Sequence, residues 1–233
     1  IDVDKLGTYT ANYERFTSHV YEDKKSFRRA AYSAYRERAI GLGAMGFHSY
    51  LQRNGLPFSG IYAASFNNRA FSQIRKLAEK ASRHLAGLRG ESPDMVGSGR
   101  RNSHLLAIAP NASSSIICGG TSPSIEPSRA NVYTHKTLTG SFKVKNKYLE
   151  KLLKKKKMNT EEVWSSIAAD HGSVQKLEEL SEEEKEIFLT APEINQIWII
   201  EHAKLRQEYV CQSQSVNVFF TFPPATASQK VHD

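Results

Sequence analysis

The stretch Leu105-Leu-Ala-Ile-Ala-Pro-Asn-Ala-Ser-Ser-Ser115 decides the fold of this chain and its candidate site. Residues 105–109 are apolar at every position, and Pro110 ends the run. An uninterrupted apolar run of strand length predicts a strand with both faces covered, as in a parallel α/β sheet or barrel.

The residues that follow this strand form a candidate anion site. Asn111 to Ser115 are small and polar, so their backbone N–H groups can converge on an anion while the hydroxyls add donors. A helix that begins near Ser114 would add the attraction of its dipole. A serine-rich stretch of this kind can equally be an ordinary turn, and the residues alone leave both interpretations open.

Helical periodicity and short apolar strands alternate on both sides of this stretch. Further strands are expected at Arg38–Leu42 and Val216–Phe220, and a long loop at Gly87–Gly99. Helices are expected from Tyr13 to Ala34 (one or two), from Ala44 to an end at Asn54-Gly55, from Phe71 to Leu85, from Val163 to Gly172, and after capping boxes at Ser181/Glu184 and Thr190/Glu193. The alternation predicts an α/β fold.

The other motifs in the sequence give weaker indications of a functional site. Gly41-x-Gly43-x-x-Gly46 matches a dinucleotide fingerprint, but no acidic residue follows it before Glu79, which favours a tight turn with close packing. Cys118 and Cys211 lie far apart, which is typical of a reducing compartment, and each is more often a packing residue than a nucleophile. No histidine spacing typical of a metal site occurs.

Composition excludes several classes. The 233 residues are 39% hydrophobic and 24% charged, and no apolar run approaches the roughly 20 residues of a membrane helix. The net charge of +8 suits partners that carry phosphate. The one dense lysine cluster, Lys151 to Lys157, is followed by acidic stretches, which indicates solvated helix faces rather than a nucleic-acid surface. The chain begins without Met or a signal peptide and is expected to be a piece of a longer protein.

Four stretches carry a resemblance to a known family: Arg38–Phe47, Arg101-Asn-Ser103, Leu106–Ser115 and Gly120–Pro127, with a weaker match at Gln212–Phe220. The sequences of these stretches resemble the large (α, catalytic) subunit of class I ribonucleotide reductase, and they are most similar to the phage-type enzymes. The resemblance implies that residues 1–233 are part of a single domain, the C-terminal half of a ten-stranded α/β barrel that is incomplete by itself.

The resemblance also implies an activity and a site. The whole enzyme would convert ribonucleoside diphosphates to deoxyribonucleoside diphosphates by thiyl-radical chemistry, for DNA synthesis. In this chain Pro110, Asn111, Ala112, Ser113 and Ser114 would hold the substrate diphosphate, largely through backbone amides. That assignment agrees with the anion site expected from the residue types alone.

The same resemblance places the reactive groups outside these residues. The radical cysteine and the reducing cysteines match neither Cys118 nor Cys211, so no catalytic residue, metal ligand or cofactor is expected here, and the chain alone is expected to be inactive. The whole enzyme would need the remaining large-subunit segments, a small (β) subunit with a radical-generating metal centre, and a dithiol reductant, thioredoxin or glutaredoxin. No nucleic acid or membrane is expected, and the location would be cytoplasmic, that of the host if phage-encoded.

Two alternatives stay open at this stage. The first is a nucleotide- or phosphate-binding module without a catalytic role, which would bind diphosphates by itself. The second is a fragment of a cobalamin-dependent (class II) reductase, which would share the barrel but need no small subunit.

Overall fold

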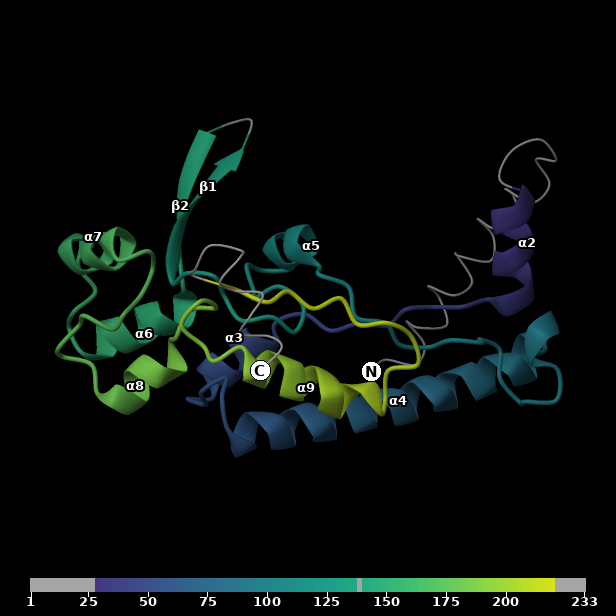
Figure 1. Ribbon diagram of the computed structural model, residues 1–233. Helices are drawn as coiled ribbons and strands as arrows, with labels where there is room; N and C mark the ends of the chain where they lie inside the picture. Colours follow the sequence, from purple (N-terminus) through teal and green to yellow (C-terminus); the bar gives the residue numbers. More distant parts are fainter. Residues whose placement is uncertain (1–27, 138–139, 221–233) are drawn as a thin grey trace. The chain divides into compact units, whose positions relative to one another are not determined.

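The computed structural model of the protein describes residues 28–137 and 140–220 (Figure 1). These residues fold into two compact units. The described part of the first unit comprises residues 28–43, 66–109 and 204–215, and that of the second comprises 44–65, 110–137, 140–203 and 216–220. That residues 1–233 make up a single domain stays a prediction, and the helix expected around Tyr13 to Val20 lies outside the described residues.

Three extended segments run parallel in the first unit. Leu42 pairs with Leu106, and Ile108 pairs with Gln214, each in an isolated parallel bridge. The segment that contains Leu105 therefore lies between the other two. Leu105 and Leu106 are both fully buried, and because adjacent side chains of an extended segment point to opposite faces, both faces are covered as predicted.

The strand predicted at Val216–Phe220 is wrong in its position. The residue that pairs is Gln214, and residues 216–220 have no strand structure. One physical reason is that the Phe219 N–H donates to the side-chain oxygen of Gln196 at 2.8 Å, instead of to a neighbouring strand. Within the described ranges the only continuous sheet has two strands, so the half barrel of parallel strands stays a prediction.

The helices of the first unit hold these segments. In α2 (Arg28–Glu37) and the long α4 (Ile61–Arg89), apolar residues recur at helical spacing, and the predicted face of α4 is buried at Phe71, Ala78, Ala81 and Leu85. The helix continues through Gly87, so the loop predicted to begin there starts later and contains the 3-10 helix η1 (Pro93–Met95). The buried Arg101 guanidinium donates to the Gly90 carbonyl at 2.8 Å, beyond the end of α4.

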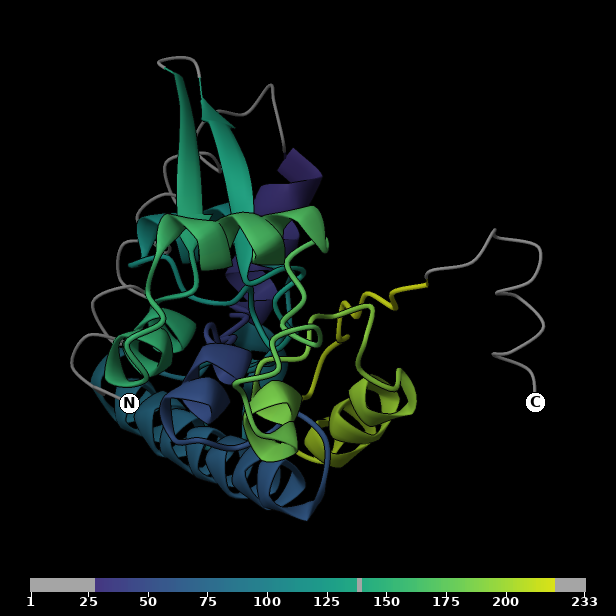
Figure 2. The same ribbon diagram turned by 90° about the vertical axis from the view of Figure 1, so that its left-hand side faces the viewer.

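The second unit begins with α3 (Phe47–Arg53), which ends at Asn54 and Gly55 as predicted. The short α5 (Ala112–Ile117) comes next in it. An antiparallel hairpin follows, β1 (Val132–Thr137) and β2 (Gly140–Lys145), with a register that pairs Val132 with Lys145 and Thr137 with Gly140 (Figure 2). This hairpin was not predicted from the sequence, although Val-Tyr-Thr-His-Lys-Thr is rich in β-branched and aromatic residues.

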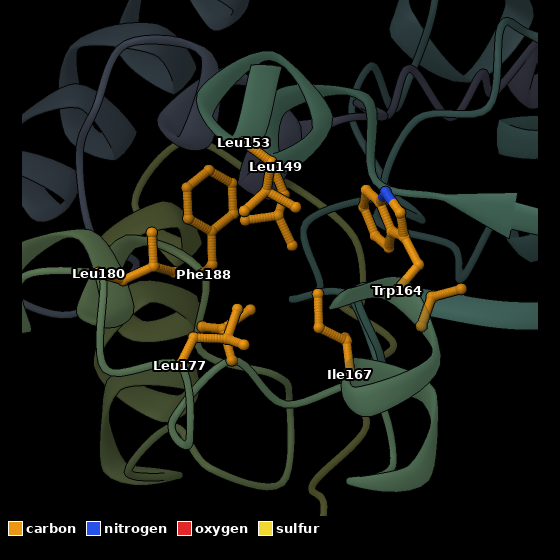
Figure 3. Close-up of a cluster of buried hydrophobic side chains, with 9 residues drawn as sticks. Leu149, Leu153, Trp164, Ile167, Leu177, Leu180 and Phe188 are labelled. Carbon is orange, nitrogen blue, oxygen red and sulfur yellow. The ribbon is translucent and has the colours of Figure 1, made fainter. Parts of the chain in front are cut away.

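Three further helices surround a hydrophobic cluster in the second unit. They are α6 (Lys147–Lys155), α7 (Glu161–Ala169) and α8 (Glu182–Ile187). The side chains labelled in Figure 3 point toward one another. Leu149 and Leu153 come from α6 and Trp164 and Ile167 from α7, whereas α8 adds only the partly buried Ile187 at the edge. The cluster consists of Val132, Leu149, Leu153, Trp164, Ile167, Val174, Leu177, Leu180 and Phe188. Because β1 contributes Val132, this cluster anchors the base of the hairpin.

Two predicted capping boxes have different outcomes. The Ser181/Glu184 box is confirmed at the start of α8. At Thr190 the Glu193 carboxylate accepts from the backbone N–H at 2.7 Å and from the hydroxyl at 2.6 Å, but these bonds close a turn. The helix expected to begin there, α9 (Ile197–Gln207), starts later. Of the helices that the structure describes, none has the length and apolar character to cross a membrane.

Candidate functional site

A cavity of about 460 Å³ lies wholly within the second unit. Its walls come from Ser49 of α3, from the start of α5, from the chain after α5, from the hairpin, from the start of α6 and from one residue near the end of the described chain. The lining residues are Ser49, Pro110, Ala112, Ser115, Ile116, Gly120, Thr121, Ser122, Pro123, Glu126, Ser128, Arg129, Ala130, Tyr133, Val144, Lys145, Asn146, Lys147, Tyr148 and Asn217. A cavity of this size is typical of small-molecule sites.

The first turn of α5 forms one side of the cavity. Asn111 precedes the helix in the left-handed conformation, with φ 51° and ψ 30°, and its side chain does not cap the helix. The Ser115 N–H donates to the Asn111 carbonyl at 3.0 Å, which is the first bond of the helix. The N–H groups of Ala112, Ser113 and Ser114 come before that bond and have no acceptor within the helix, so they can donate to an anion.

Charged side chains on the remaining walls are mainly basic. Arg129, Lys145 and Lys147 line the cavity together with one carboxylate, that of Glu126. Lys145 also contacts Glu161, with Nζ 2.5 Å from Oε1, and the hydrogen bonds from Lys145 and Lys143 lower the pKa of that exposed carboxyl. The excess of cations favours a negatively charged ligand.

Glu126 is the acidic exception in the cavity wall. Its side chain is buried, and the Asn217 amide donates to Oε1 at 2.6 Å. A hydrogen bond to a charged acceptor offsets part of the cost of burying the carboxylate. The pair therefore places a carboxylate and an amide where a polar but uncharged part of a ligand could bind.

One continuous stretch, residues 122–129, supplies five of the lining residues and is called the wall segment below. The helix α3 packs against it. The Gly46 N–H donates to the Ser122 carbonyl at 2.9 Å, and the side chains and backbones of Ser49 and Ser122 bond reciprocally at 3.0 and 2.8 Å. The wall segment is thus fixed by the start of α3.

The structure separates the five predicted site residues. Pro110 and Ala112 line the cavity, Asn111 precedes α5, and the exposed Ser113 and Ser114 follow in its first turn without being among the lining residues. Ser115, the last residue of the stretch expected to bind an anion, also lines the cavity, whereas the remaining lining residues were not predicted from the sequence. The polar ones among them are scattered along the chain from Ser49 to Asn217, and only the unpredicted hairpin brings Tyr133 and Lys145 to the site.

The glycine motif before α3 has a packing role, as predicted. A side chain at Gly41 would come within 3.1 Å of the Ala107 side chain on the neighbouring parallel segment. Gly46 has φ +78°, and a side chain there would collide with Thr121. These contacts explain two of the three glycines without a nucleotide.

Both cysteines are free thiols. Cys118 is exposed at the end of α5. Cys211 Sγ accepts from the N–H of Leu105 at 3.1 Å and of Leu106 at 3.4 Å. Burial acts to raise the pKa of the Cys211 thiol, but these two N–H groups and the Arg75 charge outweigh it and lower the pKa. Over residues 28–137 and 140–220, no three His, Cys, Asp or Glu side chains gather where they could hold a metal ion.

Comparisons with known proteins show which family this chain matches. The chain matches the family described as "Ribonucleotide reductase, barrel domain" over residues 1–98 and 92–232. It is 49% identical over 219 residues to the ribonucleoside-diphosphate reductase large subunit of Invertebrate iridescent virus 3, covering 92% of this chain and 34% of the relative. It is 31% identical over 232 residues to the ribonucleoside-diphosphate reductase large subunit of Caenorhabditis elegans, and the match covers 86% of this chain and 29% of that relative.

A solved structure is similar as well. The Actinobacillus ureae class Id ribonucleotide reductase alpha subunit superposes with a TM-score of 0.84 at 42% identity, covering 94% of this chain and 41% of that one. The fold is therefore derived from an α/β barrel. The chain spans about a third of the length of these two large subunits. On the match over nearly all of its residues, the chain belongs to the ribonucleotide reductase barrel-domain family.

Proposed function

We propose that this chain is part of the catalytic large subunit of a ribonucleoside-diphosphate reductase, and that its cavity binds the substrate with the diphosphate at the first turn of α5. The observation that carries the proposal is the composition of the cavity, in which Ala112 of the first turn of α5 and the cations Arg129 and Lys147 border one space of about 460 Å³. In catalysis this part would hold the diphosphate so that the ribose is oriented for reaction.

The substrate would lie with its two ends in different surroundings. Pro110, Asn111, Ala112, Ser113 and Ser114 would hold the diphosphate, mainly through backbone N–H groups. The carboxylate of Glu126 repels phosphate, so we place the uncharged nucleoside on the side of Glu126 and Asn217. The names of the relatives, ribonucleoside-diphosphate reductase large subunits, support this substrate class.

The partners and cofactors belong to the same proposal. The remaining large-subunit segments would complete the barrel, and a small subunit with a metal centre would generate the radical. Thioredoxin or glutaredoxin would supply electrons, in the cytoplasm. The similarity to a class Id alpha subunit supports a class I enzyme over the cobalamin-dependent alternative.

The test is the affinity of the large subunit for ADP and CDP in variants of Ala112. Aspartate there places a carboxylate next to the proposed diphosphate, and at about 5 Å and an effective dielectric constant of about 20 each pair of like charges costs roughly 3 kcal/mol. We therefore expect Ala112→Asp to raise Kd roughly a hundredfold. An acidic residue in the first turn stabilises a helix, so the fold should persist.

Two further variants complete the design. Ala112→Asn has nearly the same shape without the charge and should bind within about tenfold of the parent. Ser114→Ala removes one hydroxyl and leaves the backbone N–H, so its effect should not exceed the roughly 10- to 150-fold of one hydrogen bond to a charged group. Parent-like binding by Ala112→Asp would exclude this cavity as the diphosphate site. Tight nucleotide binding without any reductase activity in the complete subunit would favour the non-catalytic binding module.

A further inference from the structure

The helix α3 contributes Ser49 to the cavity, and the residues at its start are hydrogen-bonded to the wall segment. Gly46 precedes the helix with φ 78° and provides no side-chain cap. The N–H groups that a cap would otherwise satisfy donate to the wall segment: Phe47 to the Ser124 carbonyl at 3.2 Å, and Ser49 to the Ser122 hydroxyl at 3.0 Å. The start of α3 therefore fixes the first half of the wall segment.

His48, in the same turn of α3, is hydrogen-bonded to the second half of the wall segment. Its Nδ1 accepts the backbone N–H of Ser128 at 3.0 Å, and Ser128 is followed by Arg129, which lines the cavity. The imidazole has no solvent exposure and packs against the Phe58 ring, with centroids 5.5 Å apart and an interplanar angle of 89°. A histidine that accepts through Nδ1 must be neutral with its proton on Nε2.

Other contacts of the wall segment at this point run to residues outside α3, and one of them is the Arg129 guanidinium 5.5 Å from the centroid of the Phe219 ring. The Ser128 carbonyl accepts from the Ala191 N–H at 2.8 Å, and the Asn217 amide donates to Glu126. The bond to His48 is therefore the contact that ties the backbone between Glu126 and Arg129 to α3. Loss of the acceptor would leave the Ser128 N–H without a partner or let the wall segment move away to find one.

We infer that His48 is a positioning residue of the substrate cavity: through its unprotonated Nδ1 it holds the Ser128 amide and so places Glu126 and Arg129 against the ligand. The inference rests on the proposed function, because the ligand is the nucleoside diphosphate of that proposal. His48 touches no ligand itself, and its effect is on how well the binding wall is formed before the substrate arrives.

The experiment compares two replacements of His48 in the large subunit, with Kd for ADP and CDP and the KM and kcat of reduction as readouts. In His48→Asn the side-chain oxygen can take the place of Nδ1 as acceptor, so binding should stay within about threefold of the parent. In His48→Leu the acceptor is gone, and Kd and KM should rise about 5- to 100-fold with kcat changed much less.

His202→Leu is the matched control for the loss of a buried imidazole. His202 has no solvent exposure either and lies in the same aromatic group, but its Nε2 bonds to the Phe58 carbonyl at 2.9 Å rather than to the wall segment. This variant should lose stability without raising Kd. An increase in Kd as large as that of His48→Leu would show that general loosening is the cause and would overturn the inference.

The remaining outcomes separate the two proposals. A folded His48→Leu that binds like the parent, or a His48→Asn that binds as poorly as His48→Leu, would overturn the role of His48 while leaving the proposed function intact. A parent that binds neither ADP nor CDP would overturn both. Should His48→Leu not fold, ¹⁵N NMR of the parent at pH 7 still decides: an unprotonated Nδ1 and a protonated Nε2 support the inference, and the other tautomer or a charged ring refutes it.

Discussion

Acid should destabilise this protein through His48 in particular. Burial lowers the pKa of the His48 imidazole from 6.5 to about 4, against a weaker opposing effect of the Ile187 backbone. Between these two values the unfolded chain binds a proton that the folded chain does not, so the stabilising contribution is complete above pH 6.5 and is lost as the pH falls toward 4. Linkage across this interval amounts to about 3 kcal/mol, of which about 2 kcal/mol is lost between pH 7 and pH 5.

Urea unfolding of the parent and of His48→Asn at pH 7, 6 and 5 isolates this contribution. The other titrating groups are the same in both proteins, so their contributions cancel in the difference between the two free energies of unfolding. Between pH 7 and pH 5 the free energy of unfolding of the parent should fall by about 2 kcal/mol more than that of His48→Asn. A difference that does not change with pH would mean that His48 titrates as in the unfolded chain, and the buried neutral imidazole described above would be wrong.

Three other predictions concern the framework. Cys211→Ser keeps an acceptor for the N–H groups of Leu105 and Leu106 and should leave stability and reductase activity nearly unchanged, whereas Cys211→Val leaves both N–H groups unsatisfied and should lower the free energy of unfolding by about 1–3 kcal/mol. Trp164→Ala in the hydrophobic cluster should cost about 3–5 kcal/mol in urea unfolding, and Trp164→Phe distinctly less. Gly46→Ala should lower the melting temperature, because the left-handed backbone and Thr121 both oppose a side chain there; an unchanged melting temperature would contradict the geometry of this turn.

The sequence was sufficient where local signals decide the structure. The helix that contains Phe71 and the capping box at Ser181 each follow from a few neighbouring residues, and the structure confirms them. The apolar run at Leu105 is buried as predicted, but within the described part of the chain it pairs only through the isolated bridges of Leu106 and Ile108 and not as a continuous strand. The same kind of local signal gave a wrong helix start at Thr190. The hydrogen bonds of a capping box can close a turn as well as begin a helix, and the residues after Glu193 decide which of the two forms.

The candidate site was harder to predict because most of it is made by distant contacts. Residue types indicated the small, polar stretch after Pro110 as a candidate anion site, although the helix considered from Ser114 begins at Ala112. They could not identify Arg129, Lys147 or Asn217, since an isolated cation or amide has no pattern along the chain. The role inferred for His48 depends on a bond to Ser128, which lies 80 positions away in the sequence.

The most direct test of the diphosphate site is a crystal structure of the large subunit with CDP bound. We predict that diphosphate oxygens lie within about 3.2 Å of the backbone nitrogens of Ala112, Ser113 and Ser114, with the nucleoside extending toward Glu126 and Asn217. A diphosphate bound away from the first turn of α5, with this cavity empty, would contradict the central claim.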